Sequence, residues 1–436
     1  MSLDFTVYTA AVVLPVTAPP IAQGSVAVRD GRIVHVGERR WVQEQLAERG
    51  ARVREVFWHG ILTPGLVNAH THLQYTAMAS LGAVTYPSFG AWVEAFNREY
   101  AASHDWRASA ADGARLAIRS GTTAAADVVT DAAAASALHD AGLRGIAYWE
   151  VMDWSNERWV REGRRRVEAE LEALPATPGR GLAPHAPYSL ETVALMETPD
   201  IARERGARLH IHLGEIELER AFEHDAGEPW HARRPASLKE IRTAGLGISA
   251  TDYVDHLGVL GPDCHIAHGV YMTAQDRALL RQRHTTVALC PRSNAVLGLD
   301  EPPVAAYLRE GSPIAVGTDS LASSPSLDVM ADVAELARLA RAQGYADADL
   351  ASRLLTAATL GGARALGLDS GTERIGQLSV GARADLAFFD LEPSGPEHAA
   401  DELVEHGAGR AAGTVLGGRF AYAEDRLAHQ EPSHDD

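Results

Sequence analysis

Two histidines one residue apart, His70 and His72, lie in the segment VNAHTHLQYT, directly after the apolar run GILTPGL. We expect this run to form a β-strand. Because side chains two residues apart in an extended chain point to the same side, both imidazoles can reach one point in space, as two ligands of one metal ion must. In a chain with 19 histidines, one such pair can also arise by chance in a surface loop. The pair alone therefore leaves a metal site and an ordinary loop both open.

Further side chains that bind metals or transfer protons stand near the ends of other expected strands. They are His185, His210 and His212 with Glu215 three residues on, His265 and His268, and Asp319. Any single one can be a satisfied core or loop residue, but five strand ends would all have to carry such a group by accident. Zn²⁺ accepts histidine nitrogen and carboxylate oxygen at roughly 2.0–2.2 Å, and a catalytic site keeps one position for water. We therefore assign four ligands: His70, His72, His212 and Asp319.

Two other histidines are expected to lie deeper in the fold. His210 shares the strand face of His212 but stands one pleat further in, so we expect it to be buried support. His265 precedes His268 by three residues and is expected in the middle or at the start of its strand.

Short apolar strands alternate with helical stretches through the long middle of the chain. The eight strand candidates are GILTPGL, GTTAAADVV, GLRGIAYWEV, GRGLAPHAPYS, ARLHIHLGE, DCHIAHGV, TTVALCPRSN and SPIAVGTDS. Repeated strand–helix units build a parallel sheet. Eight of them close a (β/α)8 TIM barrel, an α/β fold that carries its catalytic groups at the carboxyl ends of the strands. We predict this barrel for residues 60–367.

Both ends of the chain are rich in short strands. Residues 4–58 contain the runs FTVYTAAVVLP, GSVAVRDGRIVHVG and ARVREVFWHG, with a hairpin signal at RDGR, and the end contains ADLAFFDL and GTVLGGRFAYAEDR. We therefore predict a small β-sandwich built from residues 1–59 and 368–425. The polar insert at 216–250 is expected to be a long loop with a helix near the active-site face, and residues 426–436 a disordered tail.

The composition limits the classes of partner. The formal net charge of −18 argues against nucleic acid and anionic membranes, which bind basic patches. The start MSLDFTVYTAAVVLP lacks the basic segment of a signal peptide, and no apolar run approaches the roughly 20 residues of a membrane span. Only two cysteines occur, Cys264 and Cys290, which we expect to be packing residues of a protein in a reducing cytoplasm. We expect a small-molecule substrate and a homo-oligomer.

The motifs HTH, HIHLGE, HGV and GTDS, in this order, resemble the amidohydrolase superfamily. They are most similar to its deaminase branch, which holds adenosylhomocysteine, guanine and aminodeoxyfutalosine deaminases and the triazine hydrolases. The resemblance extends from LTPGLVNAHTH to IGQLSVGARADLAFFD and so covers most of the chain. In that branch the first two histidines, the histidine of HxxE and the aspartate after the eighth strand bind one metal. The glutamate moves a proton, and the histidine of the sixth strand contacts the attacking water or the tetrahedral centre. The resemblance implies these roles for His70, His72, His212, Asp319, Glu215 and His268, in that order.

Members of the superfamily with two metals bridge them with a carboxylated lysine. The only lysine of this chain, Lys239, lies in RRPASLKEIRTAGL, which is typical of a loop or helix and not of a strand end. His185 stands where the bridging lysine would be. We therefore expect one metal ion, zinc or alternatively iron(II). The other zinc deaminase fold needs H-x-E followed by P-C-x-x-C, which the two cysteines cannot make.

The expected reaction is the hydrolytic removal of an amino group from a heterocycle. A bound metal ion lowers the pKa of water from about 15.7 toward 7. Asp319, with a free second oxygen, would accept a proton from this water. Glu215 would protonate a ring nitrogen, and His268, as a donor, would stabilise the developing charge.

Six residues are expected to contact the substrate: His185 in HAPYS, Phe89 and Trp92 in TYPSFGAWVEAF, Arg292 and Asn294 in CPRSN, and Ser320 in GTDS. Phe89 and Trp92 can stack on a base or simply pack. Arg292 can pair with a substrate carboxylate or form a structural ion pair, and Asn294 can hold its loop or a substrate oxygen.

Within the branch, HTHLQYTAM, PSFGAW, CPRSN and GTDSLASS most resemble aminodeoxyfutalosine deaminases of menaquinone biosynthesis, whose substrate is an adenine nucleoside ending in a benzoate. The resemblance implies the conversion of 6-amino-6-deoxyfutalosine to futalosine and ammonia. A deaminase of adenosine, methylthioadenosine or adenosylhomocysteine is the first alternative, and a triazine chlorohydrolase the second. A metal-free assembly protein is the alternative of another class, and the four intact ligand positions count against it.

Overall fold

The computed structural model describes residues 4–222 and 246–428. Lys239, most of the insert at 216–250 and the tail beyond residue 428 lie outside the described residues. Within the described ranges, none of the helices has the length and apolar character needed to cross a membrane.

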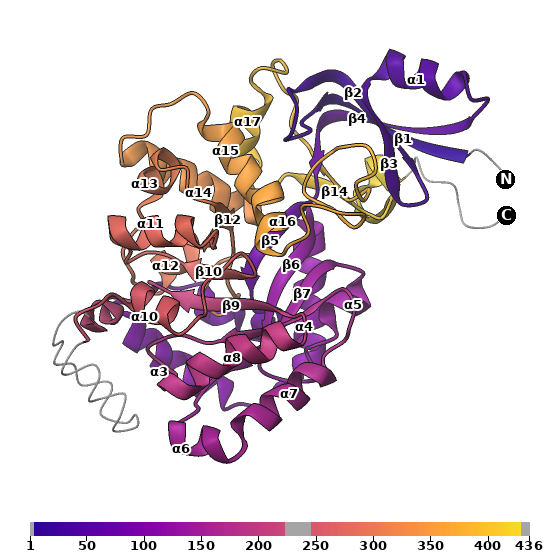
Figure 1. The fold of residues 1–436 in the computed structure, drawn as a ribbon. Coiled ribbons are helices and arrows are strands. Elements are labelled where there is room, and N and C mark those ends of the chain that lie inside the picture. Colours follow the sequence, from indigo (N-terminus) through magenta and orange to yellow (C-terminus); the bar gives the residue numbers. More distant parts are fainter. Residues whose placement is uncertain (1–3, 223–245, 429–436) are drawn as a thin grey trace. The chain divides into compact units, whose positions relative to one another are not determined.

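Eight parallel strands form the predicted barrel, and they follow one another round the sheet in chain order (Figure 1). They are β5 (Leu66–Thr71), β6 (Thr122–Val129), β7 (Arg144–Val151), β8 (Arg180–Pro184), β9 (Arg208–Leu213), β10 (Cys264–His268), β11 (Thr286–Leu289) and β12 (Ile314–Val316). After β12, the backbone N–H groups of Thr318 and Asp319 donate to the carbonyl oxygen of His70 at 3.1 and 2.9 Å. These bonds bring the end of the last strand to the first.

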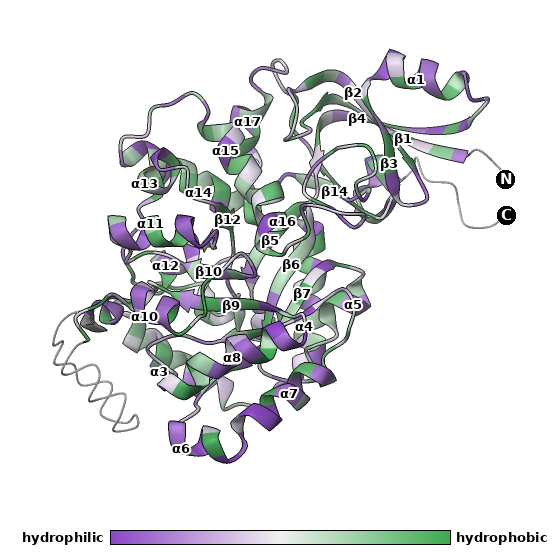
Figure 2. Cartoon of the chain, in the orientation of Figure 1, coloured by the Kyte–Doolittle hydropathy of each residue, from purple (hydrophilic) through white to green (hydrophobic). Residues whose placement is uncertain are grey.

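Helices and helical turns connect the barrel strands and follow the last of them, as the alternating pattern predicts. In chain order they are a turn at Leu73–Met78, α2 (Ala79–Gly82), α3 (Phe89–Tyr100), α4 (Trp106–Arg119), α5 (Ala137–Ala141), α6 (Asn156–Arg158), a turn at Trp159–Gly163, α7 (Arg164–Ala173), α8 (Thr192–Glu204), a turn at Glu217–Phe222, α10 (Ala250–His256), α11 (Ala274–Gln282), α12 (Pro291–Val296), α13 (Val304–Arg309), α14 (Val329–Ala342), α15 (Leu350–Thr356), a turn at Ala357–Gly361 and α16 (Gly362–Ala365). Charged α7 and apolar β6 contrast clearly in Figure 2, as expected for an outer helix and a buried strand.

The two ends of the chain together form a separate seven-stranded sheet, which confirms the predicted composite β domain (Figure 1). The sheet order is β15-β14-β13-β4-β1-β2-β3, and β1 and β4 are its parallel pair. The elements are β1 (Asp4–Val13), β2 (Ile21–Arg29), β3 (Arg32–Glu38), α1 (Arg39–Ala47), β4 (Arg52–Pro64), β13 (Leu386–Phe389), α17 (Ala399–His406), β14 (Ala411–Leu416), β15 (Arg419–Ala423) and α18 (Asp425–Ala428).

The core of this domain takes side chains from both ends of the chain. Tyr8 and Val26 from the start pack with Phe388 and Val415 from the end in one buried cluster. Burial of apolar area in a single cluster therefore joins segments that are more than 300 residues apart in sequence.

The first barrel strand begins later than predicted. The run GILTPGL does not form it, because residues up to Pro64 belong to β4 and pair with β13. Gly65 separates the two strands, and a Cβ at this position would meet the Thr123 side chain at 2.1 Å. His70 is therefore inside β5, and His72 follows its last residue. The apolar pattern hides this boundary because both strands are buried on either side of it.

The chain forms two compact units. One comprises Met1–Asn68, Arg115–Ala124 and Asp328–Asp436, and the other comprises Ala69–Ala114 and Ala125–Leu327. All residues predicted for the site belong to the second unit. The predicted domain limits near residues 60 and 367 stay predictions.

Candidate active site

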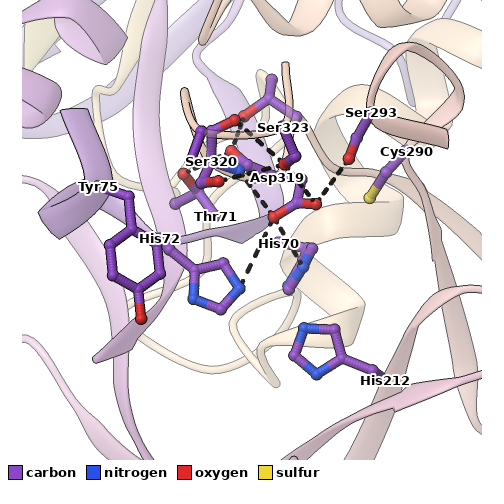
Figure 3. A network of polar contacts seen from close by, with 12 residues as sticks. His70, Thr71, His72, Tyr75, His212, Cys290, Ser293, Asp319, Ser320 and Ser323 are labelled. Atoms are coloured by element: carbon purple, nitrogen blue, oxygen red, sulfur yellow. Dashed lines mark hydrogen bonds and ion pairs between the residues drawn. The ribbon is translucent and has the colours of Figure 1, made fainter. Parts of the chain in front are cut away.

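The four side chains assigned as metal ligands meet at the carboxyl ends of their strands (Figure 3). Ring nitrogens of His70, His72 and His212 lie within 4.8 Å of one another. Oδ1 of Asp319 lies 3.5 Å from Nε2 of His70 and 3.7 Å from Nε2 of His72. Two ligands of one zinc ion, at its usual bond lengths and a tetrahedral angle, are about 3.4 Å apart. The spacing of the three histidine nitrogens, and that of Asp319 from His70 and His72, therefore suits a single ion.

Burial and neighbouring groups prepare these side chains for a cation. Burial lowers the pKa of His70 well below its usual value, that of His72 to about 3, and that of His212 below its usual value. The three rings are thus neutral near pH 7. Burial opposes the ionisation of Asp319, but its close contact with His70 and the other nearby imidazoles hold the pKa of its carboxyl well below the usual range. Three neutral nitrogens and one carboxylate form a donor set that zinc prefers.

Asp319 is held by three serines, of which only Ser320 was singled out from the sequence, as a substrate contact. The hydroxyls of Ser293 and Ser323 donate to Oδ2 of Asp319 at 2.7 and 2.8 Å (Figure 3). The backbone N–H of Ser320 donates to Oδ1 at 2.7 Å. The expectation that Asp319 has a free second oxygen is therefore wrong, because two hydroxyls bind Oδ2. Asp319 also has a φ of 60°, a left-handed conformation that is uncommon for residues other than glycine.

Glu215 is buried beside the ligand set, as the HxxE spacing predicts. The Tyr188 hydroxyl donates to Oε2 of Glu215, and Nε2 of His268 lies 3.5 Å from Oε1. Glu219 fixes the loop after β9, because its carboxylate accepts backbone N–H bonds from residues 214, 215 and 216 at 2.7, 2.7 and 3.3 Å. Tyr188 and Glu219 were not predicted. The sequence offers only their positions as clues: Tyr188 lies three residues after His185, and Glu219 lies four residues after Glu215.

His268 is oriented by Asn294. Nδ1 of His268 lies 3.0 Å from Oδ1 of Asn294, and both side chains are buried. Because an amide oxygen only accepts, Nδ1 of His268 carries a proton, which leaves Nε2 to face Glu215. The predicted role of His268 as a donor to the reacting centre then requires its protonated form. Asn294, which was expected to contact the substrate, is placed here as a support of His268.

Glu150, at the end of β7, is a buried carboxyl that the sequence analysis overlooked. Burial, with the negative charges of nearby carboxylates, raises its pKa to about 8. Glu150 has an oxygen within 4.8 Å of ring nitrogens of His185 and His212. This group cannot hold a second ion beside the first, because Nδ1 of His212 donates to the carbonyl oxygen of His185 at 2.9 Å. That bond leaves Nε2 as the one ligand atom of His212.

A cavity of about 620 Å³ lies against the ligand set, with His72, His212, Glu215 and Asp319 in its wall. Four of the predicted substrate residues line it as well: His185, Phe89, Trp92 and Ser320. The aromatic wall continues through Phe96 and Tyr100. The indole N–H of Trp92 donates to the carbonyl oxygen of Ala322 at 2.9 Å, which fixes this ring. A cavity of this size suits a ligand larger than a free base.

Arginines from the segment after β7 line the same cavity. The guanidinium of Arg158 lies 4.2 Å from the ring centre of Trp154, and that of Arg166 lies 5.9 Å from it. Both arginines are partly exposed and pair with glutamates of their own helical segment at about 3 Å. Arg292, the arginine predicted for a substrate carboxylate, is not among the cavity-lining residues of the described chain, and its Nη1 donates to Ser326 at 2.9 Å.

The amidohydrolase family model matches residues 61–420. The 5-methylthioadenosine/S-adenosylhomocysteine deaminase of Moorella thermoacetica is 31% identical over 403 residues, which cover 87% of this chain and 84% of that protein. The protein of the same name from Halobacterium salinarum is 33% identical over 384 residues, which cover 85% of this chain and 81% of that protein.

Solved structures share the fold. An adenosine deaminase from Xanthomonas campestris with bound zinc has a TM-score of 0.79 at 25% identity, and the match covers 98% of this chain and 95% of that chain. The Helicobacter pylori aminofutalosine deaminase in complex with methylthio-coformycin also has a TM-score of 0.79, at 23% identity, with 95% and 99% of the two chains covered. At this identity the second likeness concerns the fold alone. The matched family model and the curated relatives place the chain in the amidohydrolase family, in its branch of metal-dependent deaminases.

Proposed function

We propose that this enzyme hydrolyses the exocyclic amine of an adenine nucleoside, with 6-amino-6-deoxyfutalosine as the first candidate substrate. The observation that carries the deaminase chemistry is the position of Glu215, which is buried against His268 at the edge of the four-ligand set. A positioned carboxyl beside an activated water is what proton transfer to a ring nitrogen needs. Curated relatives at 31% and 33% identity are named as deaminases of adenine nucleosides, which supports the class of substrate.

The residues described above fit a zinc ion. Nε2 of His70, His72 and His212 and Oδ1 of Asp319 would hold it, and His185 replaces the lysine of two-metal relatives. When bound, the ion supplies an acidified water, whose pKa falls from about 15.7 toward 7. Iron(II) suits the same nitrogen and oxygen donors and is the alternative metal.

We assign the proton transfers to Glu215. Oδ2 of Asp319 accepts two serine hydroxyls, so Asp319 serves mainly as a ligand that its serines hold in place. Glu215 would accept the proton of the attacking water and deliver it to a ring nitrogen, which makes the adjacent carbon electrophilic. Tyr188 keeps the Glu215 carboxylate in position throughout. A protonated His268 would donate to the oxygen that develops charge. Glu215 would then pass the second proton of the added water to the amino nitrogen, so that the C–N bond breaks, ammonia leaves and the oxygen becomes the carbonyl of the product.

The shape of the cavity supports a nucleoside with a large 5′ group. Phe89 and Trp92 offer flat apolar surface for a base or an arene, and their rings lie 5.5 Å apart. Arg158 and Arg166 line the same cavity, are partly exposed and lie close to Trp154. Their guanidinium groups could pair with a carboxylate of the substrate. A benzoate-bearing adenine nucleoside matches both features. Methylthioadenosine and adenosylhomocysteine are the second candidates, because the relatives named above carry these names.

A substrate screen tests the proposal. The zinc-replete protein is incubated separately with aminodeoxyfutalosine, methylthioadenosine, adenosylhomocysteine, adenosine and a chlorinated triazine, while ammonia and chloride are measured. The proposal predicts ammonia from the nucleosides, with the highest kcat/KM for aminodeoxyfutalosine. A higher value for methylthioadenosine or adenosylhomocysteine would move the protein to the second candidates. Release of chloride from the triazine, with no release of ammonia from any nucleoside, would refute the proposed deaminase function.

A further inference from the structure

A second histidine lies directly behind one of the proposed metal ligands. Nε2 of His210, on β9, is 2.7 Å from Nδ1 of His70, on β5, and both side chains are fully buried. Nδ1 of His210 is in turn 3.0 Å from the backbone carbonyl oxygen of His265, on β10. Three strands of the barrel, of which only β9 and β10 are neighbours in the sheet, are thus linked by one chain of hydrogen bonds that ends at a ligand.

The backbone carbonyl at the far end sets the direction of every bond in this chain. A carbonyl oxygen only accepts, so Nδ1 of His210 must carry the proton. The neutral ring then has a lone pair on Nε2, and Nδ1 of His70 must donate to it. His70 is left with its own lone pair on Nε2, the atom that lies 3.5 Å from Oδ1 of Asp319. With both rings neutral, this one acceptor fixes the position of each proton in the chain.

We propose that His210 is a positioning residue, which fixes His70 as the Nδ1–H tautomer and so presents Nε2 of His70 to the metal. The inference rests on the metal site proposed above. A histidine ligand is usually oriented by a carboxylate, a backbone carbonyl or water on its other nitrogen. His212 follows that rule, because its Nδ1 donates to the carbonyl oxygen of His185. His70 instead depends on a side chain, and a side chain can be changed by mutation.

Three variants separate this role from general packing. His210→Leu removes the acceptor and keeps a buried apolar side chain. His210→Gln keeps the polarity, because its amide can donate to the carbonyl of His265 while its oxygen accepts from His70. His265→Phe is the control: the His265 ring is equally buried and stacks on His210 at 4.0 Å. Its substitution removes a different buried bond, from Nε2 of His265 to the carbonyl oxygen of Ala69 at 3.0 Å, but leaves in place the backbone carbonyl that holds His210.

The measurement is the zinc affinity of each full-length protein after removal of metal, determined by competition with a chromophoric chelator. Thermal unfolding of the metal-free proteins shows whether each variant folds. We expect His210→Leu to bind zinc about 10–100-fold more weakly than the wild type, and His210→Gln and His265→Phe to stay close to it. Equal affinity of His210→Leu and the wild type would overturn the inference. So would a loss in His210→Gln or His265→Phe as large as that in His210→Leu.

A second measurement applies even where His210→Leu does not fold. Imidazole ¹⁵N spectra of the metal-free wild type report which nitrogen of each ring carries the proton, and the His70 signals are identified by their absence in His70→Asn. We expect His70 to be protonated at Nδ1, and protonation at Nε2 would overturn the inference. A wild-type protein that binds no zinc at all would instead refute the metal site itself.

Discussion

Nε2 of His268, the last residue of β10, lies 3.5 Å from Oε1 of Glu215, in the loop after the adjacent strand β9, so an imidazole and a carboxyl face each other beside the four-ligand set. Neither group is a ligand in the proposed site. The first two predictions concern this pair and its neighbour Tyr188.

Glu215→Gln should keep zinc and lose turnover. Glutamine has the same shape and still accepts the Tyr188 hydrogen bond, but it cannot carry the proton to the ring. A positioned acid–base group contributes about 10²–10⁴-fold, so kcat should fall at least 100-fold. Zinc content by elemental analysis and ammonia release are measured on the same preparation. A variant that kept more than about a tenth of the wild-type rate would lie outside that range, and the assigned role would be withdrawn.

Tyr188→Phe should reduce kcat about 10-fold or more with zinc content unchanged, because it removes the hydrogen bond that holds Oε2 of Glu215. Tyr345→Phe is the control, since the Tyr345 hydroxyl also donates to a carboxylate, Asp349, at 2.7 Å, and neither residue belongs to the site. Steady-state kinetics of both variants should show a loss in the first alone. Similar losses in both would mean that Tyr188 acts through stability.

The sequence allows part of this site to be predicted. His70, His72, His212 and Asp319 could be assigned because they follow or end apolar strands, and parallel strands bring their carboxyl ends together. The limit of β5 was misplaced because the apolar pattern runs unbroken across Gly65. Bonds between side chains from different strands, such as that between His70 and His210, leave no trace in the spacing of either motif.

The sequence offered little basis for predicting which arginine would pair with a substrate carboxylate, and the reason is physical. Arg292 stands in the motif CPRSN and Arg158 in none of the motifs named above, yet the side chain of an arginine is long enough to turn either toward a cavity or away from it. Packing decides the direction, as the hydrogen bond of Arg292 to Ser326 and the contact of Arg158 with Trp154 illustrate. Ser293 and Ser323, whose hydroxyls bind Asp319, were missed in the same way, because serine is common and its partners are set by tertiary contacts.

Arg158→Met should raise KM for aminodeoxyfutalosine about 10-fold and change KM for methylthioadenosine little, because only the first substrate carries a carboxylate. The arginine is partly exposed, so water screens the pairing and keeps the effect moderate. Arg292→Met is the matched control and should affect both substrates equally. If instead Arg292→Met selectively raised KM for the carboxylate substrate, Arg292 would be the anion-binding residue, as first expected from the sequence.

The buried carboxyl of Glu219 should make stability depend on pH. Burial raises its pKa from 4.5 to about 8 in the folded protein, although three backbone N–H groups oppose this. Between these values the unfolded chain loses the proton and the folded protein keeps it. The unfolded state therefore binds fewer protons, and this group makes stability fall as pH rises from about 4.5 to 8, by at most ~1.4 kcal/mol per pH unit.

Glu219→Gln mimics the protonated acid and should remove this contribution. The variant should therefore become more stable relative to the wild type as pH rises. Urea unfolding at pH 5, 6.5 and 8 gives the difference between the two proteins. Glu217→Gln, at an exposed acid two residues away, should follow the wild type at each pH. A wild-type minus Glu219→Gln difference that stays constant with pH would show that Glu219 is ionised in the folded protein throughout.

The most direct test of the account is a zinc titration of the metal-free protein, with ammonia release from an adenine nucleoside followed at each addition. The four ligands described here form one site, so activity should rise from near zero and reach its plateau at one zinc per chain. His70→Ala and Asp319→Ala should neither retain zinc nor reach that activity. A plateau at two zinc ions per chain, or full ammonia release before any zinc is added, would contradict the account.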